Sequence, residues 1–289
     1  MQNFKQDFTS RQYMVTPDFE YFHYIDKPEL EVEYHNHDFF EVYFFISGQV
    51  TYVIEGKSYR LKPGDIILVH SRELHKPIIE AGGTYQRRVL WVNPDFLKKQ
   101  STDGANLSMC FESEIPERHN LIRPNAEMQA NIKNILTRFE RACVSTSFGS
   151  AILRNTYVLE LIIYLNRAVL EAYDEDISID IEYNEKINNI MRYINENLCS
   201  DLPLDSLAAK FYMSKYHLLR EFKKHTGFTI HKYICQKRLI LSKALLKEGL
   251  SVTEVCTRCG FSDYSNFIRS FKSAYGVPPR KYMMDNRRQ

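Results

Sequence analysis

The chain has 289 residues, which is long enough for two domains that each bury a core of their own. Its content of 44% hydrophobic and 26% charged residues is ordinary for a soluble protein. The longest apolar stretch, 158–170, is interrupted by Glu160, Asn166 and Arg167 and does not reach the length of a membrane span. The N-terminus has no apolar signal-peptide core, so we expect a cytoplasmic protein with no membrane partner.

Charge is distributed unevenly along the chain, although the net charge is only +2. Residues 184–289 contain 19 lysines and arginines against 9 aspartates and glutamates, a balance of +10, whereas residues 1–183 contain 19 against 27, a balance of −8. A basic C-terminal third is the electrostatic footprint expected of a domain that binds nucleic acid. The charge alone is a weak signal, since many basic surfaces are merely solvated.

The first third of the chain is typical of a β domain. Residues 1–17 are expected to form an irregular arm, and from Asp18 to about Val92 short runs rich in Tyr, Phe, Val and Ile alternate with turn signals such as Pro63-Gly64-Asp65. These runs predict strands at 41–47, 50–55, 58–61 and 66–69. Many short strands in close succession predict a barrel or a jelly roll.

One cluster in this β domain carries potential chemistry, His35-x-His37-x3-Glu41-x6-Gly48. The two histidines are expected on one face at the end of a strand, because side chains alternate with a period of two. Imidazole and carboxylate groups are ligands that suit Fe, Mn, Zn or Ni. A polar pocket for a small molecule would use the same side chains.

A second cluster, Gly64-x5-His70-x-Arg72-x2-His75, follows about 30 residues later. Together the two clusters resemble the paired motifs of the cupin family, but His70 and Arg72 stand where the cupin motif has Pro and Gly. This departure changes the loop and places a cation beside the site. The resemblance implies that four residues occupy metal-ligand positions: His35, His37, Glu41 and His75.

We expect the cluster to serve as a ligand pocket at a barrel mouth, with no bound metal and no cofactor. Tyr52 and Trp91 are expected neighbours, although each aromatic residue taken alone is equally well explained as core. Aromatic faces with a few charged hydrogen-bonding groups suit a sugar or another polar metabolite. The expected ligand-binding residues are His35, His37, Glu41, Tyr43, Arg72 and His75.

Two amphipathic helices are expected next, at 125–143 and 150–172. In the second helix, apolar residues recur at i, i+4 spacing and need a surface to bury them. They either pack against the barrel and the preceding helix or form the helix-to-helix seam of a homodimer, and we expect the dimer. This row consists of Leu153, Tyr157, Leu161, Leu165 and Val169.

One pattern occurs twice in the C-terminal third. Residues 220–233 have the sequence R-x-F-K-x3-G-x5-Y, and residues 269–282 repeat that spacing 49 positions later. An internal repeat indicates one supersecondary unit used twice. Ser214 and either Ser262 or Asp263 are suitable N-caps, and Gly227 and Gly276 are suitable helix-ending glycines. The sequence therefore predicts two helix-turn-helix units joined by a long helix at 229–247.

The segment 184–282 resembles the DNA-binding domain of AraC/XylS-type transcription regulators. The resemblance includes Arg238-Leu239, Gly260-Phe261-Ser262-Asp263 and the repeated element; Cys256 departs from it, since the family prefers a small Ala there, and we expect this cysteine to fill a core position. A cupin-like region is this family's usual effector domain, so the resemblance covers most of the chain. It implies that DNA is contacted by Lys215, Tyr216, His217, Arg220, Lys223, Tyr264, Ser265, Asn266, Arg269 and Lys272.

The expected fold is α+β and multidomain: a cupin-like β-barrel or jelly roll with its arm at 1–123, a helical connector at 124–172, a linker at 173–183 and an all-α double helix-turn-helix domain at 184–289. The expected function is sequence-specific regulation of transcription rather than catalysis. The expected partners are double-stranded DNA, a small-molecule effector, RNA polymerase and a second copy of the chain. Two alternatives stay open, a metal-dependent cupin enzyme fused to a DNA-binding domain and an architectural DNA-binding protein without a ligand.

Overall fold

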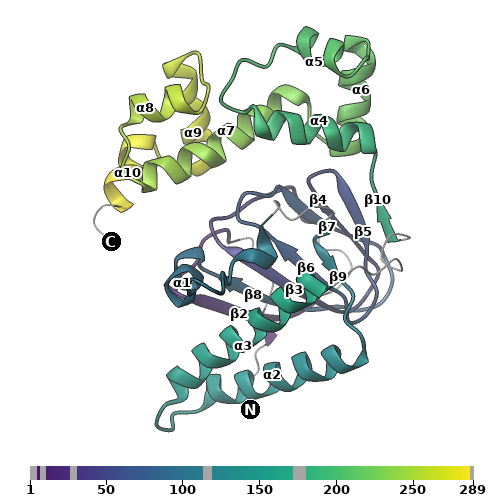
Figure 1. Cartoon of the computed structure of the whole chain (residues 1–289), viewed down its shortest axis with the longest axis vertical. Coiled ribbons are helices and arrows are strands. Elements are labelled where there is room, and N and C mark those ends of the chain that lie inside the picture. The colour runs from purple at the N-terminus through teal and green to yellow at the C-terminus, as the bar shows by residue number, and fades with distance from the viewer. Residues whose placement is uncertain (1–4, 7–10, 27–30, 113–118, 172–179, 287–289) are drawn as a thin grey trace. The chain divides into compact units, whose positions relative to one another are not determined.

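The computed structural model describes residues 5–6, 11–26, 31–112, 119–171 and 180–286 (Figure 1). Much of the expected N-terminal arm and most of the expected linker at 173–183 lie outside the described residues. The chain divides into two compact units, one formed by residues 1–54 and 58–182 and the other by residues 55–57 and 183–289. None of the described helices is long and apolar enough to cross a membrane.

The first unit is built on two β-sheets. All described strand pairs are antiparallel except β1 with β2, which is parallel. The described strands form two separate sheets. They do not close into the single barrel that was one of the two expected architectures. The larger sheet has the order β1 (Lys5–Gln6), β2 (Phe19–Asp26), β8 (Tyr85–Val92), β3 (Phe40–Ser47), β6 (Ile66–Val69) and β9 (Leu121–Ile122), and the smaller has the order β10 (Ile181–Glu182), β5 (Lys57–Arg60), β4 (Val50–Ile54) and β7 (His75–Ile79).

Strand β3 is buried on both faces because each face meets a different core. Tyr43 and Phe45 belong to a buried cluster made of residues from both sheets, whereas Val42 and Phe44 belong to a second cluster shared with helices. Successive side chains of a strand point to opposite faces, so this alternation is the expected consequence of a strand placed between two packed layers.

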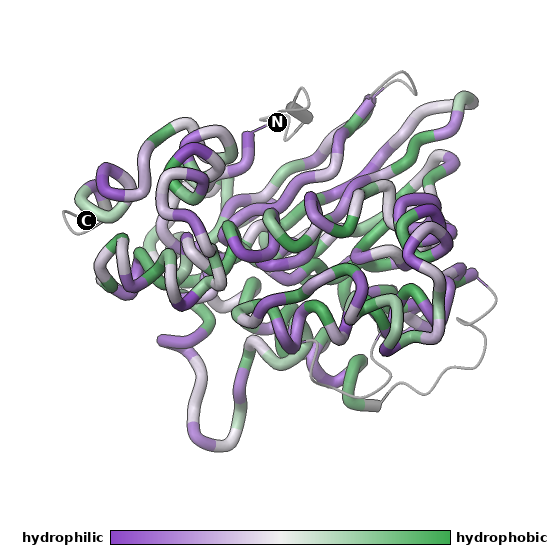
Figure 2. Tube along the Cα trace, turned by 90° about the horizontal axis from the view of Figure 1, so that it is seen from above, coloured by the Kyte–Doolittle hydropathy of each residue, from purple (hydrophilic) through white to green (hydrophobic). Residues whose placement is uncertain are grey.

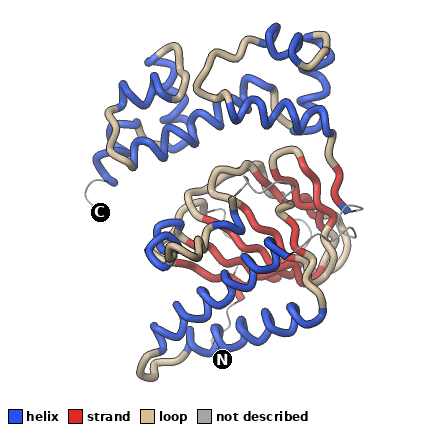
Figure 3. The backbone as a smooth tube through the Cα atoms, in the orientation of Figure 1, coloured by secondary structure: helices blue, strands red, loops and turns tan. Residues whose placement is uncertain are grey.

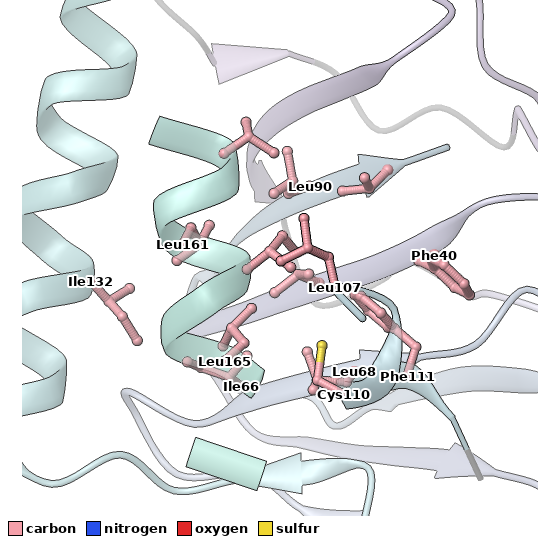
Figure 4. Packing of buried hydrophobic residues seen from close by; sticks show 14 of the residues in the cluster. Phe40, Ile66, Leu68, Leu90, Leu107, Cys110, Phe111, Ile132, Leu161 and Leu165 are labelled. Atoms are coloured by element: carbon pink, nitrogen blue, oxygen red, sulfur yellow. The ribbon is translucent and has the colours of Figure 1, made fainter. Parts of the chain in front are cut away.

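Helices cover the outer face of the larger sheet (Figure 1). α2 (Ala126–Val144) and α3 (Ser150–Glu171) form a hairpin, and α1 (Pro94–Gln100) and the 3-10 helix η1 (Met109–Phe111) complete the layer. Figure 4 shows the packing, in which Phe40 stacks on Phe111 with ring centroids 4.4 Å apart.

The i, i+4 row predicted for α3 is only partly the buried face. Leu161 and Leu165 are buried as expected, but Leu153 is 44% exposed, and the other buried apolar residues described in this helix are Val158 and Ile162. The reason is geometric, because each step of four residues advances about 40° around a helix with 3.6 residues per turn. A row of five such positions therefore turns away from the core.

The second unit is all-helical, as predicted (Figure 3). Apolar and polar residues alternate along the chain, which is visible as green and purple along the trace in Figure 2. The buried Cys256 and Cys259 belong to the core of the second helix-turn-helix, in agreement with the prediction that Cys256 fills a core position. The helices are α4 (Glu185–Glu196), α5 (Leu204–Lys210), α6 (Lys215–Thr226), α7 (Ile230–Lys247), α8 (Val252–Arg258), α9 (Tyr264–Tyr275) and α10 (Pro279–Asn286).

The helix boundaries of the repeat follow from its capping residues. The Ser214 side chain accepts a hydrogen bond from the backbone N–H of His217 at the start of α6, and Asp263, rather than Ser262, caps α9 in the same way. Gly227 and Gly276 end the two helices in the left-handed region, with φ of +77° and +74°. Glycine reaches this region without the steric penalty that a Cβ imposes.

Two glycines of the second unit provide a matched test of this reasoning. Gly260 has φ +77° and Gly276 has φ +74°, but a Cβ at Gly260 would lie 2.8 Å from the carbonyl oxygen of Cys199, whereas a Cβ at Gly276 meets nothing within 4 Å. Gly276→Ala should lower the free energy of unfolding by about 1–2 kcal/mol through backbone strain alone. Gly260→Ala should lower it by more, because the backbone at Cys199 must also move. Urea unfolding followed by circular dichroism checks this; equal losses would mean that the contact relaxes without cost.

Candidate nucleic-acid interface and buried polar site

Helices α6 and α9 present the same arrangement of side chains. Leu218 and Phe222 of α6 are fully buried, as are Phe267 and Phe271 at the positions 49 residues later in α9. These apolar pairs fix which face of each helix turns inward. All ten residues predicted to contact DNA are exposed: Lys215, Tyr216, His217, Arg220, Lys223, Tyr264, Ser265, Asn266, Arg269 and Lys272.

The two helix-turn-helix units differ by one residue in their turns. α5 and α8 are offset by 48 positions, but α6 and α9 are offset by 49, so the turn of the second unit is one residue longer. In each turn one residue adopts a left-handed conformation, Tyr212 with φ 52° in the first and Gly260 with φ 77° in the second. A tyrosine at positive φ is uncommon, and its side chain is 94% exposed.

The two repeated arginines have different surroundings. The guanidinium of Arg220 lies 3.2 Å from the carboxylate of Glu221 and 3.4 Å from Nδ1 of His217. Arg269 makes no ion pair with any residue that the structure describes. The pair at Arg220 is exposed and therefore weak, so a phosphate or a base edge can replace Glu221 as its partner. Arg269 can contact a phosphate or a base edge without first breaking an ion pair.

Helix α7 holds the two helix-turn-helix units together. It contains 18 residues and is about 27 Å long at a rise of 1.5 Å per residue. Arg238 on this helix donates hydrogen bonds to the carbonyl oxygens of Leu198 and Ser200, at 2.9 and 2.7 Å. From the sequence, Arg238 was noted only as part of the family resemblance, and no structural role was predicted for it. The structure shows that its hydrogen bonds connect α7 to the loop before α5.

In the first unit, three of the predicted ligand-binding residues come together at one end of the sheets. His35 and His75 form an isolated antiparallel bridge, in which each backbone N–H donates to the other's carbonyl oxygen at 3.0–3.1 Å. His37 lies close by, with its ring centroid 4.9 Å from that of His75. His35 and His37 precede β3 rather than forming the end of a strand, so the predicted strand position was wrong, although the predicted proximity is present.

Glu41 is the buried carboxylate beside these histidines, with an exposed fraction of 6%. Its two oxygens accept hydrogen bonds from the Tyr52 hydroxyl and the Trp91 indole, both at 2.9 Å. Burial opposes its ionisation, but the interaction with His37, which is the largest of the opposing causes, holds the pKa of Glu41 well below its usual range. The carboxylate is therefore ionised at neutral pH.

Burial also disfavours the charged form of two of the histidines. It is the first cause that lowers the pKa of both His35 and His75, and the neighbouring imidazoles lower it further. Both imidazoles are therefore neutral near pH 7.

A second buried polar group extends the site along the inner faces of β3 and β8. The hydroxyls of Tyr43 and Tyr85 are hydrogen-bonded to each other, and Arg87 pairs with Asp26 at 2.6 Å. Burial raises the pKa of Tyr85 to about 12, so its hydroxyl stays protonated. Tyr85, Arg87 and Asp26 were not predicted as site residues. The sequence signal that could have identified two of them is the period-two alternation of a strand, which places Tyr85, Arg87 and Trp91 on one face.

Arg72 lies apart from the buried group, because its side chain is exposed. Its loop is a tight turn in which the N–H of Arg72 donates to Nδ1 of His70 and the N–H of Glu73 donates to the carbonyl of His70. The structure therefore places five of the six predicted ligand-binding residues near one another and leaves Arg72 at the surface.

A surface groove of about 740 Å³ lies elsewhere on the first unit. It is lined by the segment 15–22 and by residues of α2 and α3, including Phe139, Cys143 and Arg154, together with Arg11. The Arg11 guanidinium also lies 5.2 Å from the centroid of Trp91, the residue that donates to Glu41. The groove and the buried site thus share a neighbour.

The exposed position of Arg269 in α9 leads to a test. If Arg269 reads a base, Arg269→Ala should weaken binding to the preferred sequence by about 1–3 kcal/mol and relax the preference at one base pair. Lys272→Ala, the matched control one turn later, should weaken binding to all sequences alike and reduce its salt dependence. Competition binding with single-base variants of the site checks both. A uniform loss in Arg269→Ala would make this residue a phosphate contact.

Comparison with known proteins agrees with this geometry. A model described as AraC-like ligand binding domain matches residues 19–162, and a helix-turn-helix domain model matches residues 207–285. The HTH-type transcriptional activators RhaS of Salmonella schwarzengrund and Enterobacter sp. are 26% and 25% identical to this chain over 258 residues, and each alignment covers 88% of both proteins.

Among solved structures, unsaturated fatty acid bound ToxT from Vibrio cholerae is 14% identical, with 93% of this chain and 96% of that chain covered and a TM-score of 0.40. This likeness is low, and the family assignment rests on the sequence matches. The two matched models together span both units of the structure. The chain belongs to the AraC family of transcription regulators, with an AraC-like ligand-binding domain followed by a helix-turn-helix domain.

Proposed function

We propose that this regulator binds DNA as a homodimer through α6 and α9 and activates transcription in response to a small polar metabolite, a sugar or a related compound. The observation that carries the proposal is the duplicated helix with apolar residues inward and a row of exposed polar residues outward. An α-helix fits the major groove of DNA, and its N-terminal residues reach the base edges. The naming of relatives as transcriptional activators supports activation, for which contact with RNA polymerase is part of the proposal.

The effector is proposed to bind at the buried polar site around Glu41. Hydroxyl and carboxylate groups of Tyr43, Tyr52 and Glu41 lie there against aromatic surfaces. A few placed hydrogen-bonding groups on an apolar lining are typical of small-molecule sites. A ligand rich in hydroxyls supplies both a hydrogen-bonding edge and an apolar face, and this supports a sugar. We propose a regulator rather than an enzyme, since the named relatives regulate transcription.

A contact between the arm and the site suggests how the effector acts. Arg11 forms an ion pair with Glu20 and lies over the ring of Trp91, which in turn donates to Glu41. An effector that displaces Trp91 or takes over its hydrogen bond to Glu41 would change the packing of the arm. Regulation then requires that the effector binds one of the two arrangements more tightly than the other.

The homodimer is proposed to form through an apolar stripe on α3. Ile152, Ile163 and Leu170 are 70%, 40% and 60% exposed, and their spacing of 11 and 7 residues brings them within about 20° of one another around the helix. The first unit buries the opposite face of α3, through Leu161 and Leu165. Such a stripe is suited to a second copy of the same helix, since two copies would cover each other.

Selection of bound sequences from random duplex DNA, at physiological salt, tests the reader and the dimer together. The full-length protein should select two copies of a motif at fixed spacing and sediment as a dimer. Ile163→Arg should sediment as a monomer and select single copies, because a charged side chain cannot be buried in the seam. Binding that is sensitive to salt but indifferent to sequence would contradict the proposed function, and paired motifs in a monomeric Ile163→Arg would contradict the seam.

The effector site is tested by thermal unfolding of the full-length protein in the presence of individual monosaccharides. A sugar that binds should raise the midpoint of the first unit by mass action. Glu41→Gln should abolish that rise, since it removes the charged acceptor, whereas Arg269→Ala should retain it. Arg154→Ala, which lies in the surface groove, should also retain it. Loss in Arg154→Ala with retention in Glu41→Gln would place the effector in the groove.

A further inference from the structure

Glu221 is a half-buried carboxylate of α6 that directly follows Arg220 in the chain. Its side chain is 17% exposed, whereas the side chain of Arg220 is 59% exposed. The carboxylate oxygen Oε1 accepts a hydrogen bond from Nε of Arg220 at 3.2 Å and lies 3.2 Å from Nη2 of the same guanidinium. The guanidinium is therefore held along one side, through Nε and Nη2, and Nη1 takes no part in this contact.

The carboxylate of Glu221 has a second neighbour on its other oxygen. Oε2 lies 3.6 Å from Nε2 of His225, one helical turn later on α6. Desolvation opposes ionisation of the carboxyl group, but the hydrogen bond from Arg220, the largest of the opposing causes, lowers the pKa of Glu221 below its ordinary value. Glu221 is therefore ionised at neutral pH and accepts from Arg220 as a charged group.

The outer edge of the Arg220 guanidinium, formed by Nη1 and Nη2, stays available to DNA. Nη2 lies 3.4 Å from Nδ1 of His217, one turn earlier on α6, and Nη1 has no polar contact with any residue that the structure describes. A guanidinium carries five N–H groups, and recognition of a guanine uses two of them, directed at O6 and N7. A base edge can take the place of the long contact with His217. Contact with a base therefore does not require Arg220 to leave Glu221.

The second recognition helix has no counterpart of this arrangement. The positions 49 residues after His217 and Glu221 hold Asn266 and Ser270, and the Ser270 hydroxyl lies 3.4 Å from Oδ1 of Asn266. Neither residue is a carboxylate that could hold Arg269. A long side chain loses rotamer freedom when it binds a partner, and the loss is smaller for an arginine that is already held in one orientation. The two repeated arginines therefore differ in how far they are arranged before DNA binds.

We propose that Glu221 is a positioning residue, which fixes the guanidinium of Arg220 for one guanine and keeps it from turning to a phosphate. The inference rests on the proposed contact of α6 with the major groove and adds a specificity-determining residue to it. An arginine that turns to a phosphate adds affinity but carries no sequence information. The negative charge of Glu221 also repels the phosphates of any duplex. Both effects raise the selectivity of the first helix-turn-helix at the expense of its non-specific affinity.

The test measures how strongly full-length variants discriminate between the selected duplex and duplexes with one base pair changed, by competition binding at fixed salt. Arg220→Ala first identifies the base pair at which discrimination is lost. Glu221→Gln should lower discrimination at that same base pair by about fivefold to tenfold, which is part of what a bidentate arginine–guanine contact contributes. Its affinity for non-specific duplex should rise, because one repelling charge is gone. Glu221→Asp keeps the charge but not the reach, so it should lose the discrimination without that rise.

Glu248→Gln is the matched control for the change in net charge. It removes the same charge from an exposed residue at the C-terminal end of α7, and it should retain full discrimination. The double variant Arg220→Ala/Glu221→Gln separates positioning from a general structural role. If Glu221 acts through Arg220, the double variant discriminates no less than Arg220→Ala alone. Circular dichroism and thermal unfolding check that each variant is folded.

Three results would overturn the inference: full discrimination in folded Glu221→Gln, an equal loss in Glu248→Gln, or a further loss in the double variant. A wild-type protein that selects no sequence would contradict the proposed function together with the inference. Sequence selection by the wild type, combined with unchanged discrimination in Glu221→Gln, would contradict the positioning role alone.

Discussion

The burial of β3 on both faces connects the two cores of the first unit. Its inward side chains, Glu41 and Tyr43 among them, belong to the space between the sheets, and its outward side chains Val42 and Phe44 pack against the layer of α2 and α3. Protein interiors are close-packed and do not deform continuously. A displacement of Glu41 would therefore shift β3 and, through direct packing contacts, the helix layer that carries the proposed dimer seam.

The same constraint explains which parts of the first unit were predictable from the sequence. The strands at 41–47, 50–55, 58–61 and 66–69 correspond to β3 to β6 within one or two residues, because short runs rich in Tyr, Phe, Val and Ile between glycine-containing turns identify them locally. The separation into two sheets was not predictable in this way, since it depends on pairing between distant strands. The inward position of Arg87 likewise depends on Asp26, which lies 61 residues away.

Side-chain proximity was predictable where the backbone spacing is short and failed where a turn intervenes. His35, His37 and Glu41 are close in sequence and in space. Arg72 was expected beside them, but the turn formed by His70 and Glu73 directs it to the surface. In the second unit the prediction was more complete, since capping residues such as Ser214 and Gly227 and the buried phenylalanines act within one helix. The longer second turn was hidden by the constant spacing of the repeat.

The N-cap residues of the two repeated helices, α6 and α9, are chemically different, and this makes the two helix-turn-helix units unequal. α6 begins at the neutral Ser214, which leaves the partial positive charge of the helix N-terminus available to a phosphate. α9 begins at Asp263, whose carboxylate already occupies that end and repels a phosphate. Two helices with the same spacing of side chains are therefore unequal as anion acceptors. Under the proposed mode of binding, a duplex turned end for end would present the wrong half to each helix, so one copy of the chain would distinguish the orientation of its site as well as its sequence.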